Sequence, residues 1–361
     1  MADWLKTLLF NLDPETAHDV VKRLACLLPH SLLRKQNQIQ SPVLKLRWQN
    51  LNFNNPIGLA AGFDKEAKAL PLIESLGFGF VELGSVSYTP CEGNPKPRIF
   101  RLVKDEALIN WMGLPNPGIE TFLENLKHST SQLPRGISLV KTPDMAFELQ
   151  KITAKNGIDD FVDSYTMAHN QADYICLNLS CPNSGEAKLF EAPQEFQTLA
   201  REISLARTSL LSTTPLFVKI SPALEKADLH KTVELALKYN FDGFVVSNTT
   251  TTRPNLKSSL KAEQKKRGGL SGRPLLKLAN AQLKLVYDMV GKEKLIMGVG
   301  GVHDLPSLLS KLQNGASCVQ VYTGLIYGGM SFVRNLNLEL LQFCEKRGVK
   351  NYLELVGQKL G

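Results

Sequence analysis

The segment ICLNLSCPNSG, residues 175–185, leads from a run of apolar residues into a polar turn that carries several reactive side chains. The turn presents the carboxamides of Asn178 and Asn183, the hydroxyl of Ser180 and the thiol of Cys181. A thiol with an ordinary pKa of about 8.5 becomes a usable base or nucleophile when its surroundings lower that pKa. Carboxamides both donate and accept hydrogen bonds, which suits a flat ring with alternating N–H and C=O groups. We therefore take Cys181 as a candidate base or nucleophile in a site for a small ring.

The elements that must position this turn are indicated by eight short apolar runs, which alternate with stretches of helical period. The runs cover residues 57–62, 79–84, 136–140, 174–179, 215–220, 243–248, 295–300 and 318–323. Short runs rich in Val, Ile and Phe are typical of buried strands, and the stretches between them are typical of amphipathic helices. Eight strand–helix repeats favour a (β/α)8 barrel over a doubly wound sheet. Residues 90–112 add an apparent β-hairpin after the second strand.

The active site of a (β/α)8 barrel lies at the C-terminal ends of its strands, so the polar residues near each strand end are candidate site residues. These residues are Lys65, Ser85, Asn110, Asn178, Ser180, Cys181, Asn183, Lys219, Ser247, Asn248, Thr249, Tyr322 and Thr323. Four asparagines in this set come from different segments and converge with Lys65 on one end of the barrel. Together they predict a site for a small anionic heterocycle.

Two further features indicate a bound cofactor. The seventh and eighth strands end in glycine-rich turns, GVGG at 298–301 and VYTGLIYGG at 321–329. Exposed backbone N–H groups in such turns bind phosphate, and barrels commonly do so at this place. Lys219 lies inside the apolar run PLFVKI, where a cation needs an anionic or electron-rich partner. That partner is either an acidic residue in a structural ion pair or a negatively charged cofactor such as a reduced flavin.

The first thirty residues differ from the rest of the chain. DWLKTLLFNL (3–12) and DPETAHDVVKRLACLLP (13–29) predict two short amphipathic helices. The second has Asp13 as its N-cap, Pro14 at its first position and Pro29 as its stop. We expect residues 1–40 to form a helical segment that packs on the barrel of residues 41–361, lies in a membrane interface, or does both.

Composition sets the remaining limits. The chain has 361 residues, of which 43% are hydrophobic, and this is enough for a large core. Its formal net charge of +8 fits an anionic substrate, a phosphate cofactor, an anionic membrane surface or nucleic acid. The six cysteines show no CxxC spacing and no clustering with histidine, so we expect no metal site. Cys176 and Cys318 lie within apolar runs and are expected to be packed.

With no signal peptide and no apolar stretch long enough to span a bilayer, we expect a reduced, cytoplasmic protein.

Seven longer motifs occur in order along the chain: NPIGLAAGFDK, GNPKPRIFRL, ALINWMG, NLSCPNS, VVSNTT, GGLSGRPL and GVGGV. In this order they resemble the dihydroorotate dehydrogenases, specifically the quinone-dependent, membrane-associated class. LDPETAHDV resembles the N-terminal helical segment of that class, so the resemblance covers nearly the whole chain. It implies the FMN-dependent oxidation of dihydroorotate to orotate in pyrimidine biosynthesis, with a quinone as electron acceptor. It also implies a peripheral position on the inner face of the cell membrane.

The same resemblance implies roles for individual residues. Cys181 takes the position of the base that removes a proton from C5 of dihydroorotate, and Lys219 that of the group that stabilises the reduced flavin. The pyrimidine and its carboxylate would contact Lys65, Asn110, Asn178, Asn183, Asn248 and Thr249. FMN would contact Ala61, Gly62, Ser85, Ser138, Asn178, Lys219, Ser247, Gly272, Gly300, Gly301, Tyr322, Thr323 and Gly324. His18 would lie near the inner end of a quinone tunnel that the N-terminal helices form.

The chain departs from the quinone-dependent class at two places. Cys181 stands where that class has serine, and cysteine at this position is the habit of the soluble class. At the third strand, SLVKTP (138–143) stands where the family reads roughly NIGKNK, so Ser138 replaces a flavin-contacting asparagine and Val140 replaces a glycine. Two alternatives stay open. One is an FMN barrel like a tRNA dihydrouridine synthase, although no appended RNA-binding domain or basic helical stripe supports a nucleic-acid partner. The other is a membrane-attached barrel that binds a flavin or a pyrimidine without turnover.

Overall fold

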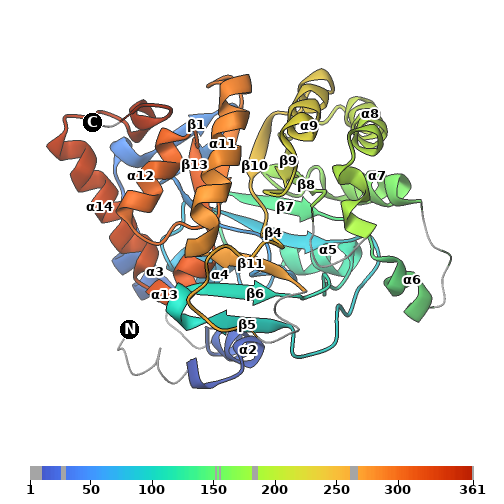
Figure 1. Cartoon of the computed structure of the whole chain (residues 1–361), viewed down its shortest axis with the longest axis horizontal. Coiled ribbons are helices and arrows are strands. Elements are labelled where there is room, and N and C mark those ends of the chain that lie inside the picture. Colours follow the sequence, from blue (N-terminus) through green and yellow to red (C-terminus); the bar gives the residue numbers. More distant parts are fainter. Residues whose placement is uncertain are drawn as a thin grey trace.

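The computed structural model describes residues 10–25, 30–150, 153, 156–180, 186–260 and 267–359 of the chain. Within them, eight parallel strands close into a barrel in the order β10, β12, β13, β3, β4, β7, β8, β9 (Figure 1). The strands are β3 (Ile57–Leu59), β4 (Phe80–Val86), β7 (Arg135–Leu139), β8 (Tyr174–Asn178), β9 (Leu216–Ile220), β10 (Gly243–Val246), β12 (Leu295–Val299) and β13 (Cys318–Val321). Each strand coincides with one of the eight predicted runs, so the predicted (β/α)8 barrel is confirmed.

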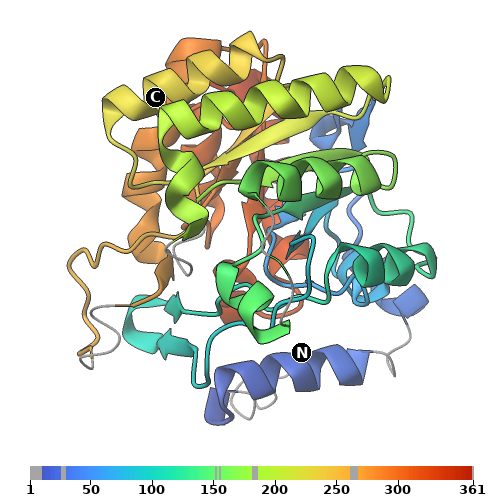
Figure 2. The same ribbon diagram turned by 90° about the vertical axis from the view of Figure 1, so that its right-hand side faces the viewer.

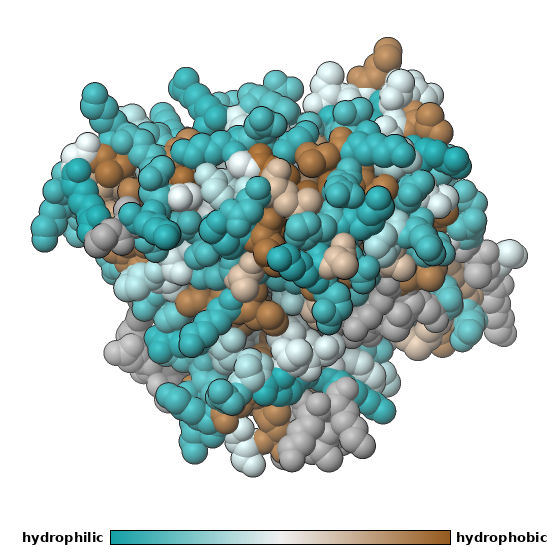
Figure 3. Space-filling view, turned by 45° about the horizontal axis from the view of Figure 1, so that its top comes forward, coloured by the Kyte–Doolittle hydropathy of each residue, from teal (hydrophilic) through white to brown (hydrophobic). Residues whose placement is uncertain are grey.

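Helices follow the strands and cover the outside of the barrel (Figure 1). They are α4 (Leu70–Ser75), α5 (Ile119–Lys127), α6 (Asp144–Gln150), α7 (Gly157–Ala168), α8 (Pro193–Ser209), α9 (Lys226–Lys238), α11 (Leu276–Val290), α12 (Leu305–Gln313), α13 (Thr323–Gly328) and α14 (Phe332–Lys346). Each longer helix buries one stripe, as α11 does with Leu283, Val286 and Val290 at spacings of three and four residues. The opposite stripes face solvent, and hydrophilic residues cover most of the face shown in Figure 3.

Strand pairing brings the ends of neighbouring strands to one side of the barrel. Asn178, the last residue of β8, pairs with Lys219 of β9. Val299, the last residue of β12, pairs with Gln320 of β13. Because all eight strands run parallel, the segments that follow these positions leave the barrel at its C-terminal end. This end is therefore where the candidate site residues are brought together.

A second, antiparallel sheet contributes to the same region of the molecule. It consists of β5 (Ile99–Leu102), β6 (Ala107–Asn110) and β11 (Gly269–Gly272), with β6 in the middle. The predicted hairpin at 90–112 is confirmed as β5 and β6, but the sequence pattern did not predict β11. Strand β11 comes from the loop after β10, and it places Gly269 opposite Asn110. A separate hairpin, β1 (Leu46–Trp48) and β2 (Leu51–Phe53), packs Phe53 against Phe80 of the barrel.

Two N-terminal helices, α2 (Pro14–Ala25) and α3 (His30–Asn37), precede the barrel. Asp13 caps α2 as predicted, because its Oδ1 accepts hydrogen bonds from the backbone N–H groups of Glu15 and Thr16. Figure 2 shows α2 running along the bottom of the molecule. Glu15 of α2 accepts three hydrogen bonds, of 2.7–3.2 Å, from the Arg98 guanidinium beside β5. The helix is thereby fixed to the small sheet by a buried ion pair.

The N-terminal segment also bears on membrane attachment. Of the predicted helix within 3–12, residues 3–9 lie outside the described residues, and so does the predicted stop at Pro29. Among the residues that the structure describes, no helix is both long enough and apolar enough to cross a membrane.

Candidate active site

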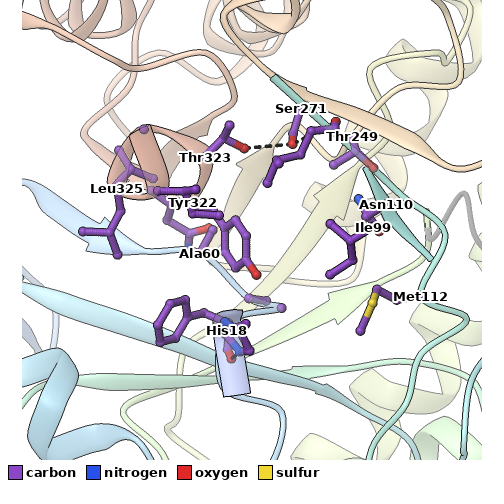
Figure 4. Close-up of a pocket in the computed structure, with 18 of the residues that line it drawn as sticks. His18, Ala60, Ile99, Asn110, Met112, Thr249, Ser271, Tyr322, Thr323 and Leu325 are labelled. Atoms are coloured by element: carbon purple, nitrogen blue, oxygen red, sulfur yellow. Dashed lines mark hydrogen bonds between the residues drawn. The ribbon is translucent and has the colours of Figure 1, made fainter. Parts of the chain in front are cut away.

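One cavity of about 1430 Å³ occupies the C-terminal end of the barrel and extends to α2. The loops after the barrel strands form one part of its wall, the small antiparallel sheet forms another, and α2 forms a third. In Figure 4, Thr323 and Ser271 lie at one end of the cavity and His18 lies at the other, with Tyr322 between them. The cavity therefore connects the C-terminal ends of the strands with the N-terminal helices.

Amide and hydroxyl groups form a connected cluster on the floor of the cavity. The Asn178 amide donates to Ser85 Oγ over 2.9 Å, and the Asn248 amide donates to Asn178 Oδ1 over 3.2 Å. The Asn248 amide also lies 2.8 Å from the Ser180 carbonyl oxygen. Asn178 and Ser85 are each 6% exposed. Because these side chains hold one another, they present fixed donors and acceptors to a ligand.

Lys219 lines the cavity directly beside this cluster, and its charge is balanced from inside the barrel. Its Nζ lies 3.7 Å from Oε1 of Glu82, whose side chain is 0% exposed. The other carboxylate oxygen of Glu82 accepts hydrogen bonds from Gln320, over 2.8 Å, and from Tyr174, over 3.4 Å. The structural ion pair considered for Lys219 is thus present, and the lysine still reaches the cavity.

The negative charge of Glu82 also affects its buried neighbours. Burial, together with the Glu82 charge, raises the pKa of Tyr174 and the pKa of the Cys176 thiol well above their ordinary values. The same two causes raise the pKa of the Cys318 thiol. These groups therefore keep their protons, and the prediction that Cys176 and Cys318 are packed cysteines is confirmed by their 0% exposure.

Glycine residues shape the end of the cavity near Thr323. Gly300 and Gly301 have φ angles of +97° and +88°, and a Cβ at either would lie 2.8 Å or 2.5 Å from Leu275 or Leu276. Glycine is needed here for both conformation and space. Across from this turn, the Thr323 hydroxyl donates to Ser271 Oγ over 2.8 Å (Figure 4). Backbone and hydroxyl groups at this end make a pocket suited to a phosphate.

Lys65, Asn110 and Thr249 stand on other parts of the same wall. The Lys65 Nζ donates to the Gly62 carbonyl oxygen over 2.9 Å. The Asn110 amide reaches the Gly269 carbonyl oxygen over 3.3 Å, so the unpredicted strand β11 orients a predicted site residue. The structure therefore brings a loop lysine, a hairpin amide and a residue after β10 to a single cavity, as the sequence predicted.

The far end of the cavity lies under α2. His18 Nε2 donates to the Phe63 carbonyl oxygen over 3.0 Å, and the two rings meet edge to face. Arg101 also lines this end, although the sequence did not single it out. It donates to the carbonyl oxygens of Phe10 and Leu12, and its guanidinium lies 4.8 Å from the centre of the Phe10 ring. This end has an aromatic and basic wall of which α2 forms a part.

Some predicted site residues are placed elsewhere or lie outside the described part. Ser138 is 0% exposed and sits behind Ser85, with 2.9 Å between the two hydroxyl oxygens, so it is not part of the cavity wall. Cys181 and Asn183 lie outside the described residues. The remaining predicted positions line the cavity: Ala61, Gly62, Ser85, Asn178, Lys219, Ser247, Gly272, Gly300, Gly301, Tyr322, Thr323 and Gly324.

Two sequence signals could have identified residues that were missed. Glu82 and Gln320 are polar residues inside the apolar runs GFVELG and CVQVYT, just as Lys219 is a polar residue inside PLFVKI. Cys91 also lines the cavity, and burial raises the pKa of its thiol, which donates to the Gly113 carbonyl oxygen. A cysteine held in this way is a poor base.

The cavity fits a flavin with a phosphate tail. Its volume accommodates a ring system together with a small substrate. A Cβ at Gly62, where φ is +108°, would meet no atom within 4 Å. A glycine-walled pocket at one end, an amide cluster on the floor and a buried lysine beside it are the features of a flavin-dependent (β/α)8-barrel oxidoreductase.

Comparisons with known proteins make the class specific. The family described as dihydroorotate dehydrogenase matches residues 43–344. A relative from Thermus thermophilus, named dihydroorotate dehydrogenase (quinone), is 40% identical over 96% of this chain and 98% of its own. One of the same name from Idiomarina loihiensis is 35% identical over 93% and 99%. A crystal structure of DHODH from Eimeria tenella in complex with ferulenol has a TM-score of 0.85 and 31% identity, over 96% of this chain and 95% of that one. The chain belongs to the dihydroorotate dehydrogenase family.

Proposed function

We propose that this protein oxidises dihydroorotate to orotate with FMN as its cofactor and passes the electrons to a quinone. One observation carries the proposal. A single cavity joins a glycine-walled phosphate pocket, an amide cluster and a chamber under α2. An enzyme that receives electrons from a polar substrate and delivers them to an apolar acceptor needs these three places around one flavin. The family assignment favours this function over a tRNA dihydrouridine synthase.

The residues that would hold FMN form two groups, one at the phosphate and one at the flavin ring. The Gly300–Gly301 turn, Gly272 and the Thr323 hydroxyl would bind the phosphate, and Ser85, Lys219 and Ser247 would line the ring. Bound there, FMN supplies the acceptor for the hydride that leaves C6 of dihydroorotate. Lys219 would hold positive charge near the ring, where negative charge develops, while Glu82 balances that charge from below.

The residues that would hold the substrate surround the amide cluster. Asn110, Asn178 and Asn248 would pair with the N–H and C=O groups of the pyrimidine, and the Lys65 ammonium would attract its carboxylate. Thr249 and Asn183 are expected to complete this set. Cys181, which directly follows Ser180 in the sequence, would take the proton from C5.

The chamber under α2 would admit the quinone. His18, Phe63 and the Arg101 guanidinium would line it, and the preceding N-terminal segment would rest on the inner face of the cell membrane. On this basis residues 1–40 act as the membrane-associating segment and residues 41–361 as the FMN-binding barrel. The protein would then be a peripheral membrane enzyme on the cytoplasmic side.

Flavin reduction tests the proposal directly. The purified full-length chain should be yellow, and dihydroorotate should bleach its flavin absorbance in the absence of oxygen. In steady state with dihydroorotate, a quinone should support faster turnover than fumarate or NAD. A flavin that dihydroorotate leaves oxidised would contradict the proposed oxidation. A faster reaction with fumarate or NAD would contradict the proposed acceptor alone.

A further inference from the structure

Lys311 is a buried cation behind the glycine turn at the phosphate end of the cavity. It lies on α12, on the inward face that it shares with Leu312, and it is 0% exposed. Its Nζ donates to the main-chain oxygen of Val299, 3.0 Å away. Val299 ends β12 and directly precedes Gly300 and Gly301, and these three residues all line the cavity. The ammonium is therefore bonded to the backbone segment that leads into this turn and forms part of the cavity wall.

Within the described residues, Lys311 has no counter-charge. In the described part of the chain, the one polar contact of its Nζ is the bond to the Val299 oxygen, and no carboxylate pairs with it. Burial lowers the pKa of Lys311 from 10.5 to about 7. A second cation near the cavity, Arg273, is by contrast half exposed and paired with Glu106 over 2.6 Å. An unpaired buried ammonium is costly, and a methionine would fill similar space without that cost. Packing therefore does not explain a lysine at this position.

We propose that Lys311 supplies the positive charge that favours binding of the cofactor phosphate at the Gly300–Gly301 turn. The inference rests on the proposed function, because it takes the phosphate to be that of FMN. A phosphate monoester carries about 1.5 to 2 negative charges at neutral pH. Opposite charges separated by a backbone turn in a poorly hydrated interior attract more strongly than they do in water. Lys311 acts through space as a positioning residue, while the turn makes the direct contacts.

Flavin binding to the full-length chain tests this role. We compare the wild type with Lys311→Met, and we use Lys277→Met as the matched control. Lys277 is an exposed lysine on α11, next to the Leu276 that packs on Gly301. At about pH 6, where the folded chain carries the Lys311 proton, each flavin-free chain is titrated with FMN and with riboflavin, which lacks the phosphate, and binding is followed by flavin fluorescence. The melting temperature of each flavin-free chain is measured alongside.

The two flavins separate the phosphate effect from a general defect. Lys311→Met should weaken FMN binding by about tenfold or more and change riboflavin binding by less than about twofold. Lys277→Met should change neither affinity by more than about twofold, because solvent screens an exposed charge. The melting temperature of Lys311→Met should not fall. Unchanged FMN affinity, or equal losses for FMN and riboflavin, would overturn the inference. A wild-type chain that binds neither flavin would overturn the proposed function and this inference with it.

Discussion

Replacing Lys311 by methionine should stabilise the flavin-free protein at neutral pH, and this gain should disappear at high pH. No carboxylate in the described part of the chain pairs with Lys311, and burial lowers the pKa of Lys311 from 10.5 to about 7. In the unfolded chain the same lysine titrates near its ordinary value. The difference between the two values corresponds to at most about 5 kcal/mol in the free energy of unfolding. Losing the hydrogen bond to Val299 offsets about 1 kcal/mol of that gain.

The sign of the pH dependence follows from proton counting. Between about pH 7 and pH 10.5, the unfolded chain carries a proton on Lys311 and the folded chain does not. Lowering the pH through this range therefore favours the unfolded state of the wild type, by up to about 1.4 kcal/mol per pH unit. Below pH 7 both states are protonated, and this contribution becomes constant. Lys311→Met lacks the titrating group, so its advantage over the wild type should grow from pH 10 down to pH 7 and then level off.

Urea unfolding at several pH values between 6 and 10 measures this advantage. Other groups that titrate in the range are common to both chains, so they cancel in the difference between the two free energies of unfolding. Lys277→Met, which removes an exposed lysine and leaves Lys311 in place, serves as the matched control. A Lys311→Met difference that stays constant across the whole range would refute the reasoning. So would a variant that is less stable than the wild type at pH 7.

Three further predictions concern the base, the N-terminal segment and its attachment. Cys181→Ala should slow flavin reduction by dihydroorotate about 10²-fold in stopped-flow measurements, whereas Cys91→Ala, a control cysteine in the same cavity, should change the rate less than about threefold. Deleting residues 1–30 should abolish turnover with quinone while dihydroorotate still bleaches the flavin; retained quinone turnover would remove the chamber assignment. Glu15→Gln should loosen α2, because breaking one partner of a buried ion pair costs about 3 kcal/mol, and hydrogen exchange should quicken in α2 with little change in the barrel strands.

The barrel could be predicted because its signals are local. Each strand is a short apolar run and each long helix buries a stripe of fixed period, so both can be recognised without knowing their partners. The strand β11 could not be predicted in the same way. Its sequence, GLSG, carries two glycines and little β-propensity, and it becomes a strand because β6 offers it an antiparallel edge. Its pairing partner lies far away in the sequence, where no local pattern indicates it.

The same limit explains which site residues were found. Asn178, Lys219 and Asn248 lie near the C-terminal ends of strands, and the barrel geometry alone predicts that they meet. Glu82 lies within β4. Its apolar neighbours in the sequence predict a buried strand and do not indicate a site residue. Only the closed barrel places it 3.7 Å from the Lys219 ammonium. The contact between Glu82 and Lys219 depends on the distance across the closed barrel. That distance cannot be worked out from the spacing of residues along the chain.

The amide cluster is supported from behind by β7. The Ser138 hydroxyl meets Ser85 Oγ, which in turn accepts from Asn178. Two hydroxyl groups in series thus link β7 to the amide cluster. Val140, which follows β7, packs against Leu114 of the loop after β6. Neither Ser138 nor Val140 lines the cavity, so both act through residues that do.

The two buried lysines near the cavity differ in a way that suits a cofactor with unlike ends. Lys219, beside the proposed ring position, is accompanied by the Glu82 carboxylate, so the pair adds little net charge there. Lys311, behind the proposed phosphate position, has no such partner among the residues that the structure describes. An anionic tail is therefore attracted to one end of the cavity, while the other end provides an ammonium group without a net positive field. This difference in charge would orient the flavin before any contact with the substrate is made, because a reversed flavin would place its phosphate beside Glu82.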